Sequence, residues 1–163
     1  MQTDIGEYVV GAYLKLEEGC DVIDYNVRAP GGGLRGLGEL DVIGLNFKTD
    51  TAFLCEVTTH IRGLLYVSNS ESLRRVKAKH ERQRAYANEY LDNFQYHRYM
   101  FWSPVVPRGF LTENLAKIDG LELVINGAYK GRVEQLRRRA RAEAQDTSNP
   151  FFRTLQILEH LRD

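Results

Sequence analysis

The stretch LGELDVIGLNFKTDTAFLCEVTT, residues 37–59, predicts the centre of the fold. Two runs rich in Val, Ile, Leu and Phe, at 39–47 and 52–58, flank the polar turn at 48–50. This pattern is typical of two β-strands joined in a hairpin. The second run is apolar on both of its sides, which indicates a central strand that is covered on both faces of a sheet.

Both predicted strands carry acidic residues among apolar ones. Because strand side chains alternate between faces, Glu39 and Asp41 point the same way from the first strand. Glu56 lies inside the apolar run of the second strand. A carboxylate in that position is costly to desolvate unless something pairs with it, and a divalent cation suits acids from adjacent strands. Glu39 and Asp41 have an alternative interpretation as the solvent-facing side of a half-exposed hairpin.

Length and composition indicate one ordinary soluble domain. The chain has 163 residues, 43% hydrophobic and 27% charged, which is enough to bury a core. We expect one domain over 1–163, with a core at 1–103 and a C-terminal strand and helical extension at 104–163. Cys20 and Cys55 lack a zinc spacing, so reduced, buried thiols and a cytoplasmic location are expected. No apolar run has the length of a membrane span and no secretion signal is evident, so no membrane partner is expected.

Helices are predicted on either side of the hairpin. Asp4 can cap a first helix that stops at Gly19. Glu7, on the first turn of that helix, either complements the helix dipole at the surface or faces the acidic hairpin. Residues 29–38 form a glycine-rich loop that lacks the ending of a phosphate-binding loop. The other expected elements are a strand at 21–28, a helix from Ser70 or Ser72 to about 93, a strand at 99–102, a helix at 111–118, a strand at 121–125, a helix at 133–144 and an amphipathic helix starting at Asn149-Pro150.

The helix that ends near residue 93 has polar residues close to its apolar stripe. Gln83 interrupts a stripe that includes Val76 and Ala87, and Lys79 flanks the same stripe. A buried glutamine needs a hydrogen-bonding partner, which is either a neighbouring backbone carbonyl or a functional group.

Acidic residues are concentrated in the N-terminal part of the chain and basic residues in the C-terminal part. Residues 1–60 hold four Lys or Arg against ten Asp or Glu, whereas residues 61–163 hold eighteen against twelve. An arginine-rich segment in the C-terminal part is either a solvated face balanced by acids or a surface that grips phosphates, and we expect the second. Its members are Arg132, Arg137, Arg138, Arg139 and Arg141.

Three short pieces of the sequence occur in a recognisable order. They are Gly6-Glu7 with Ala12-Tyr13-Leu14, then Gly38-Glu39-Leu40-Asp41-Val42-Ile43, then Cys55-Glu56-Val57-Thr58. Together with the order helix, three strands, helix, strand, they resemble the PD-(D/E)xK restriction-endonuclease-like nucleases, especially the YraN-like and Holliday-junction-resolvase-like branches. The resemblance implies an α/β fold with this core and added C-terminal helices. It also implies Mg²⁺ or Mn²⁺ held by Asp41 and Glu56, with Glu7 and Glu39 as accessory ligands.

One position departs from the family's pattern. Where the family usually has a lysine two residues beyond the acid of the third strand, this chain has Thr58. In the family that lysine orients or activates the attacking water and steadies charge on the phosphate, which a neutral hydroxyl does poorly. Some branches move the cation to the second helix, and Lys79, beside Gln83, is the expected substitute.

The sequence therefore predicts a metal-dependent endonuclease that hydrolyses the phosphodiester bonds of nucleic acid, with DNA as the expected partner. The candidate catalytic residues are Asp41, Glu56, Thr58, Lys79 and Gln83. One alternative is a degenerate nuclease fold that binds nucleic acid or a protein partner without cleavage, and another is an unrelated interaction protein. The final amphipathic helix either docks on the core or forms the seam of a homodimer.

Overall fold

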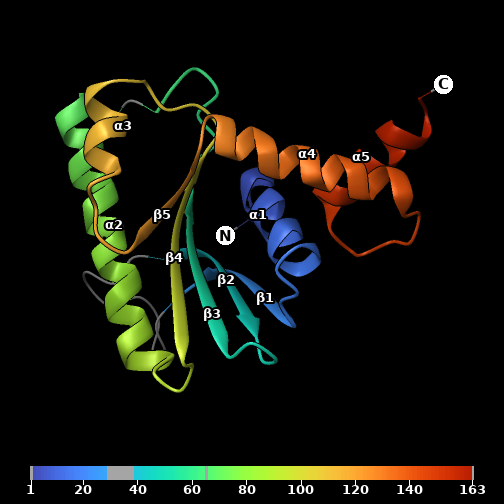
Figure 1. The fold of residues 1–163 in the computed structure, drawn as a ribbon, viewed down its shortest axis with the longest axis horizontal. Coiled ribbons are helices and arrows are strands. Elements are labelled where there is room, and N and C mark those ends of the chain that lie inside the picture. Colours follow the sequence, from blue (N-terminus) through green and yellow to red (C-terminus); the bar gives the residue numbers. More distant parts are fainter. Residues whose placement is uncertain (1, 29–38, 65, 163) are drawn as a thin grey trace.

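A mixed sheet organises the described parts of the chain, which are residues 2–28, 39–64 and 66–162 of a computed structural model (Figure 1). In these parts five strands form it in the order β1-β2-β3-β4-β5. They are β1 Val22–Val27, β2 Leu40–Asn46, β3 Thr51–Val57, β4 Tyr96–Ser103 and β5 Leu121–Ile125. β2 pairs antiparallel with β1 and β3, whereas β4 pairs parallel with β3 and β5. The protein is α/β and the predicted hairpin of β2 and β3 is confirmed.

Helices cover both faces of this sheet. The described residues contain α1 Ile5–Leu16, α2 Asn69–Tyr90, α3 Phe110–Leu115, α4 Gly127–Ala142 and α5 Pro150–His160. Helices α2 and α3 lie on one side, and α1, α4 and α5 lie on the other (Figure 1). The order helix, three strands, helix, strand agrees with the order read from the sequence.

The strand β3 is buried on both faces, as its continuous apolar run predicts. Phe53 and Cys55 pack in the core under α1, α4 and α5, while Leu54 packs in the core under α2. Complete burial of a Leu or Phe side chain contributes about 1.5–3 kcal/mol, so this doubly covered strand is a main source of stability. Residues of α5 complete the first of these cores: Phe152 is fully buried there, and the Asn149 side chain donates to the carbonyl of Tyr8 in α1.

The helix α1 begins as its sequence predicts. The Asp4 carboxylate accepts from the amide of Gly6 at 2.8 Å, and the Glu7 carboxylate accepts from the amide of Asp4 at 2.9 Å. This reciprocal arrangement is a capping box, which satisfies amides left open by the first helical turn. A Cβ atom added to Gly6 would meet the side chain of Thr59, so the start of α1 lies close beside the end of β3.

Several predicted boundaries are wrong. The cap of α2 is Ser68, which accepts from the Glu71 amide, whereas Ser72 is buried and donates to the Ser68 carbonyl; the helix ends at Tyr90. β4 starts earlier than residue 99, α3 ends before 118, and α4 spans 127–142. Gly127 and Gly131 obscure the start of α4 because glycine is a poor helix former.

Other expectations concern the chain as a whole. Cys20 and Cys55 are buried free thiols, as predicted. Burial raises the pKa of Cys20 to about 12, so this thiol is not activated. Within the described ranges no helix is long and apolar enough to cross a membrane. The predicted glycine-rich loop at 29–38 lies outside the described residues.

Candidate active site

Asp41 and Glu56 lie side by side at one end of the sheet. The β2–β3 register pairs Val42 with Cys55, so the next residues along each strand, Asp41 and Glu56, are opposite each other and project from the same face. The amide of Val57 donates to Asp41 Oδ2 at 2.8 Å, which fixes one oxygen of this carboxylate beside the end of β3. The two acids of the predicted metal site are therefore on one face, the face covered by α2.

Glu56 is buried and only partly satisfied. Its exposed fraction is 2%. Oε2 accepts from Lys79 Nζ at 3.0 Å, but Oε1 has no hydrogen-bonding partner in the described part of the chain. Burial raises the pKa of Glu56 to about 8; Lys79 opposes this shift and Asp41 adds to it. One lysine does not compensate two neighbouring carboxylates in this buried setting.

Lys79 reaches the acids from α2, as the helical spacing predicts. Its side chain is 22% exposed, with the ammonium group held against Glu56. Burial on its own lowers the pKa of Lys79, but the carboxylates of Glu56 and Asp41 outweigh that effect and raise it. Lys79 is therefore a cation close to both acids.

Gln83 fixes the helix that carries Lys79. Its side-chain amide donates to the carbonyls of Leu54 and Met100, both at 3.0 Å, which ties α2 to β3 and β4. Its oxygen lies 3.2 Å from Nδ1 of His80. Of the two interpretations of Gln83, backbone partners account for its burial, and it makes no contact with the acids among the described residues. It is a positioning residue for Lys79, one helical turn away.

Thr58 is occupied by a structural contact. It is buried on the same face of β3 as Glu56, and its hydroxyl donates to the Ser103 hydroxyl at 2.7 Å. It joins β3 to the end of β4, and it supplies no charge to the site.

The two accessory acids are less well placed than Asp41 and Glu56. Glu7 is buried rather than on the surface, and its carboxylate accepts from the Asp4 amide and, at 3.3 Å, from the Asn26 side chain. Burial raises the pKa of Glu7, the Asp4 amide lowers it, and the charge of Asp41 raises it. Glu7 is therefore close enough to Asp41 for the charge of Asp41 to affect its pKa. Glu39 pairs instead with Arg28, at 3.7 Å.

The residues at this end of the sheet fit a divalent cation held by two carboxylates. Mg²⁺ binds well to one or two carboxylates while keeping several waters. The unpartnered Oε1 of Glu56 supplies a free oxygen ligand next to Asp41. In the described residues no group of three or more His, Cys, Asp or Glu side chains is placed to hold an ion.

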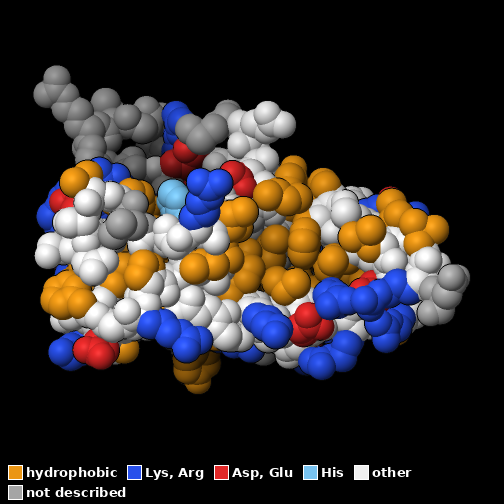
Figure 2. All heavy atoms as spheres, turned by 90° about the horizontal axis from the view of Figure 1, so that it is seen from above, with side chains coloured by type: hydrophobic (Ala, Val, Ile, Leu, Met, Phe, Trp, Pro, Cys, Tyr) orange, Lys and Arg blue, Asp and Glu red, His pale blue; other side chains and the backbone are white. Residues whose placement is uncertain are grey.

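The arginine-rich segment lies on α4 and faces acids of its own protein. Glu17 accepts from Arg139 at 2.9 Å, and the buried Glu159 accepts from Arg137 at 3.0 Å and from Arg141. Further carboxylates near this segment are Glu122 at 4.0 Å from Arg132, Glu134 at 2.9 Å from Arg137, and Glu143 at 2.9 Å from Arg139. On the face drawn in Figure 2, the end of the molecule formed by α4 and α5 shows mainly Lys and Arg side chains, with a few Asp and Glu side chains between them.

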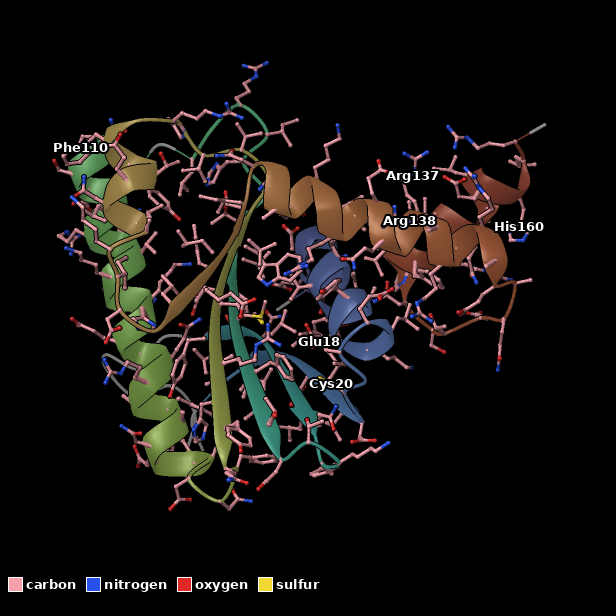
Figure 3. The ribbon with its side chains drawn as sticks, viewed as in Figure 1. Glu18, Cys20, Phe110, Arg137, Arg138 and His160 are labelled. Atoms are coloured by element: carbon pink, nitrogen blue, oxygen red, sulfur yellow. The ribbon has the colours of Figure 1, made fainter. Side chains whose placement is uncertain are left out.

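The segment is also remote from α2. Helix α4 lies on the other side of the sheet from α2, which carries Lys79 (Figure 1), and Arg137 and Arg138 are labelled on α4 in Figure 3. Arg138 makes no ion pair within the described residues, whereas its neighbours are neutralised. The structure does not bring the arginine-rich segment together with the strand acids.

A second basic surface, made by residues of the helix that carries Lys79, adjoins Lys79. A shallow groove of about 610 Å³ runs along α2. It is lined by Tyr66, Arg74, Arg75, Ala78, Lys79, Glu81, Arg82 and Ala85. The signal was present in the sequence, since 75, 79 and 82 follow the three- and four-residue spacing of one helix face.

Comparisons with known proteins add no assignment: no family model, curated protein or solved structure matches this chain.

Proposed function

We propose that the protein is a metal-dependent phosphodiesterase that cleaves nucleic acid, built on a restriction-endonuclease-like core. The observation that supports this most is the contact of Lys79 Nζ with Glu56 Oε2, at 3.0 Å, beside Asp41. A carboxylate pair with an adjacent cation is the combination that phosphodiester hydrolysis needs. Here the cation comes from α2 instead of from the position of Thr58.

The chain's own residues would divide the work as follows. Asp41 and Glu56 would hold the metal, Asp41 being fixed by the Val57 amide and Glu56 through its free Oε1. Mg²⁺, when bound, lowers the pKa of a coordinated water and offsets charge on the scissile phosphate. Lys79 would then exchange its contact with Glu56 for one with the phosphate or the attacking water, because an ammonium group has three donors to share.

A degenerate nuclease fold that binds without cutting is the second candidate. The Thr58 contact with Ser103 favours it, since the position of the family's lysine is used for structure. The ion pair of Lys79 and Glu56 also satisfies Lys79 without a substrate. Catalytic measurements separate this candidate from the first.

The test is cleavage of supercoiled plasmid, single-stranded DNA and RNA with Mg²⁺ or Mn²⁺. Lys79→Ala and Asp41→Asn should each lower the cleavage rate by about 10²-fold or more, the size expected when a charge-stabilising group is lost. Lys77→Ala, an exposed change on the same helix, should leave the rate unchanged. Cleavage by Lys79→Ala at the parent rate would refute the assignment of Lys79.

A rescue variant sharpens the assignment. Thr58→Lys in the Lys79→Ala background returns an ammonium two residues after Glu56, just beyond the end of β3. It should recover part of the activity, and Thr58→Lys alone should raise it. Circular dichroism and the denaturation midpoint establish that each variant is folded. A well-folded double variant without recovered activity would count against a charge requirement at this position.

A further inference from the structure

We infer that the groove on α2 is the track that binds the nucleic-acid backbone on the way to the site, and that the arginine-rich segment of α4 is not. This inference rests on the proposed function for the identity of the polyanion. Lys79 lines the groove and its ammonium contacts the buried Glu56 carboxylate, so a strand lying in the groove would pass the cation that reaches the candidate site.

The charges of the groove leave cations available for a ligand. Arg74, Arg75, Lys79 and Arg82 line it, with Glu81 as the one acid of the lining. Glu71, nearby, accepts from Arg74 at 2.6 Å and from Arg75 at 3.0 Å, so one carboxylate is shared by two guanidinium groups. The groove keeps a small excess of positive charge even when Glu56, the partner of Lys79, is included.

Arg82 is the least satisfied cation of the groove. Its Nε is buried and has no hydrogen-bonding partner, and no carboxylate lies within ion-pair distance of its guanidinium in the described part of the chain. Because its guanidinium lines the groove without an ion pair among the described residues, Arg82 is the cation of the lining that can take an anion without giving up a carboxylate partner. Guanidinium groups are well shaped to grip phosphate oxygens.

The guanidinium of Arg75, which lines the groove, is held in place by two neighbouring side chains. Its Cζ lies 4.5 Å from the centre of the Tyr66 ring, and Glu71 binds its Nε. A guanidinium stacked on an aromatic ring loses less freedom when it binds a phosphate, because its orientation is already restricted. Ala78 and Ala85 also line the groove, and their small side chains leave space between the longer ones.

The spacing suits consecutive phosphates of one strand. From Arg75 to Arg82 the helix rises about 10 Å, at 1.5 Å per residue. Because the cations of the groove are spread over this length, they can contact more than one phosphate of a strand. Backbone contacts of this kind carry no sequence preference, so the groove would accept unrelated sequences.

The test measures binding without cleavage. Fluorescence anisotropy in EDTA with labelled single-stranded and duplex DNA and RNA would compare the parent with Arg75→Gln/Arg82→Gln. The control, Lys77→Gln/Arg84→Gln, removes the same charge from exposed positions of α2 outside the groove. The groove variant should bind about tenfold or more weakly near 0.1 M salt and lose nearly two units of salt slope on duplex DNA. The control variant should keep nearly the affinity and the salt slope of the parent.

The other outcomes of this experiment separate failure of the groove assignment from failure of the proposed activity. Equal loss in both variants, or parent binding that polyglutamate displaces as well as DNA does, would overturn the inference, and so would a parent that binds no nucleic acid. Binding through the groove by a parent that never cleaves would leave the inference standing while the proposed activity fails. Cleavage by the parent, with unchanged binding by the groove variant, would sink the inference and leave the activity intact.

Discussion

Two buried glutamates of this protein have opposite surroundings. Glu159 on α5 is 6% exposed, and guanidinium groups of Arg137, Arg141 and Arg162 surround its oxygens. Glu56 on β3 is 2% exposed and has one lysine, an unpartnered oxygen and a second carboxylate beside it. The first arrangement stabilises an ionised carboxylate that is already satisfied, whereas the second leaves a carboxylate that gains from a further cation.

The two pKa shifts express this difference. Hydrogen bonds from Arg137 and then Arg141 lower the pKa of Glu159 to about 2. Burial raises that of Glu56 to about 8. A count of charged residues in the sequence does not distinguish these situations, since both regions combine acids and bases. The arrangement of α5 is that of a satisfied ion-pair cluster, and the arrangement of β3 supports the proposed metal site.

The largest expected effect is on the α5 side of the comparison. Glu159→Gln removes the charge that three arginines share, so the thermal midpoint at pH 7 should fall by several degrees. The pKa of Glu159 in the folded state lies below its ordinary value of 4.5, so its contribution is present above that pH and is lost as the pH falls toward 2. Differential scanning calorimetry of the parent and the variant from pH 2 to pH 7 measures the difference in thermal midpoint and its dependence on pH. A variant as stable as the parent at pH 7 would contradict the structural role.

The same substitution at Glu56 should act in the opposite direction. Without divalent cations at pH 9, Glu56→Gln should raise the free energy of unfolding by about 1 kcal/mol, because it removes a buried charge while its oxygen still accepts from Lys79. The folded-state pKa lies above 4.5, so protonated Glu56 favours the fold at low pH, and this is lost as the pH rises through about 8. Urea titrations at pH 4 and pH 9 give the comparison. A loss of stability at pH 9 would show that ionised Glu56 is well compensated.

The smallest effect is expected at Arg138, the arginine of the α4 segment without an ion pair among the described residues. Arg138→Gln should change the free energy of unfolding by less than about 0.5 kcal/mol, as exposed substitutions usually do. It should also leave the affinity for DNA unchanged. The other arginines of this segment pair with carboxylates, so Arg138 is not part of a phosphate-binding surface. Titration of labelled duplex DNA at 50 mM salt checks this. Marked weakening would restore α4 as a phosphate-binding surface.

Much of the fold could be predicted from local patterns. The Asp4 cap, the hairpin and the doubly covered β3 depend on residues close together in sequence, where spacing and turn chemistry act directly. Lys79 could be placed toward the acids because helical geometry fixes which side of α2 it occupies. The predicted cap of α2 is wrong because Ser68, Ser70 and Ser72 offer the same chemistry, and Ser72 is used in hydrogen bonds to the backbone of Tyr66 and Ser68.

The surroundings of the α4 arginines could not be predicted in the same way. Arg139 meets Glu17, which lies on the opposite end of the chain, and Arg137 meets Glu159 on the following helix. These pairs depend on how α4 crosses α1 and α5, and periodicity within α4 contains no information about that crossing. The orphaned oxygen of Glu56 is a similar case, because an absent partner is visible only when the neighbours are in place.

The packing of α5 against α1 has a consequence for synthesis of the chain. The core under α1 contains Leu136, Ala140, Phe152 and Leu155. All five described strands, with the candidate site, leave the ribosome before these side chains do. Until then one face of the sheet lacks part of its cover, and exposed apolar surface of that kind favours aggregation of nascent chains. Translation that stalls between α4 and α5 would therefore yield a species with its strands made but its core open, a natural client for chaperones.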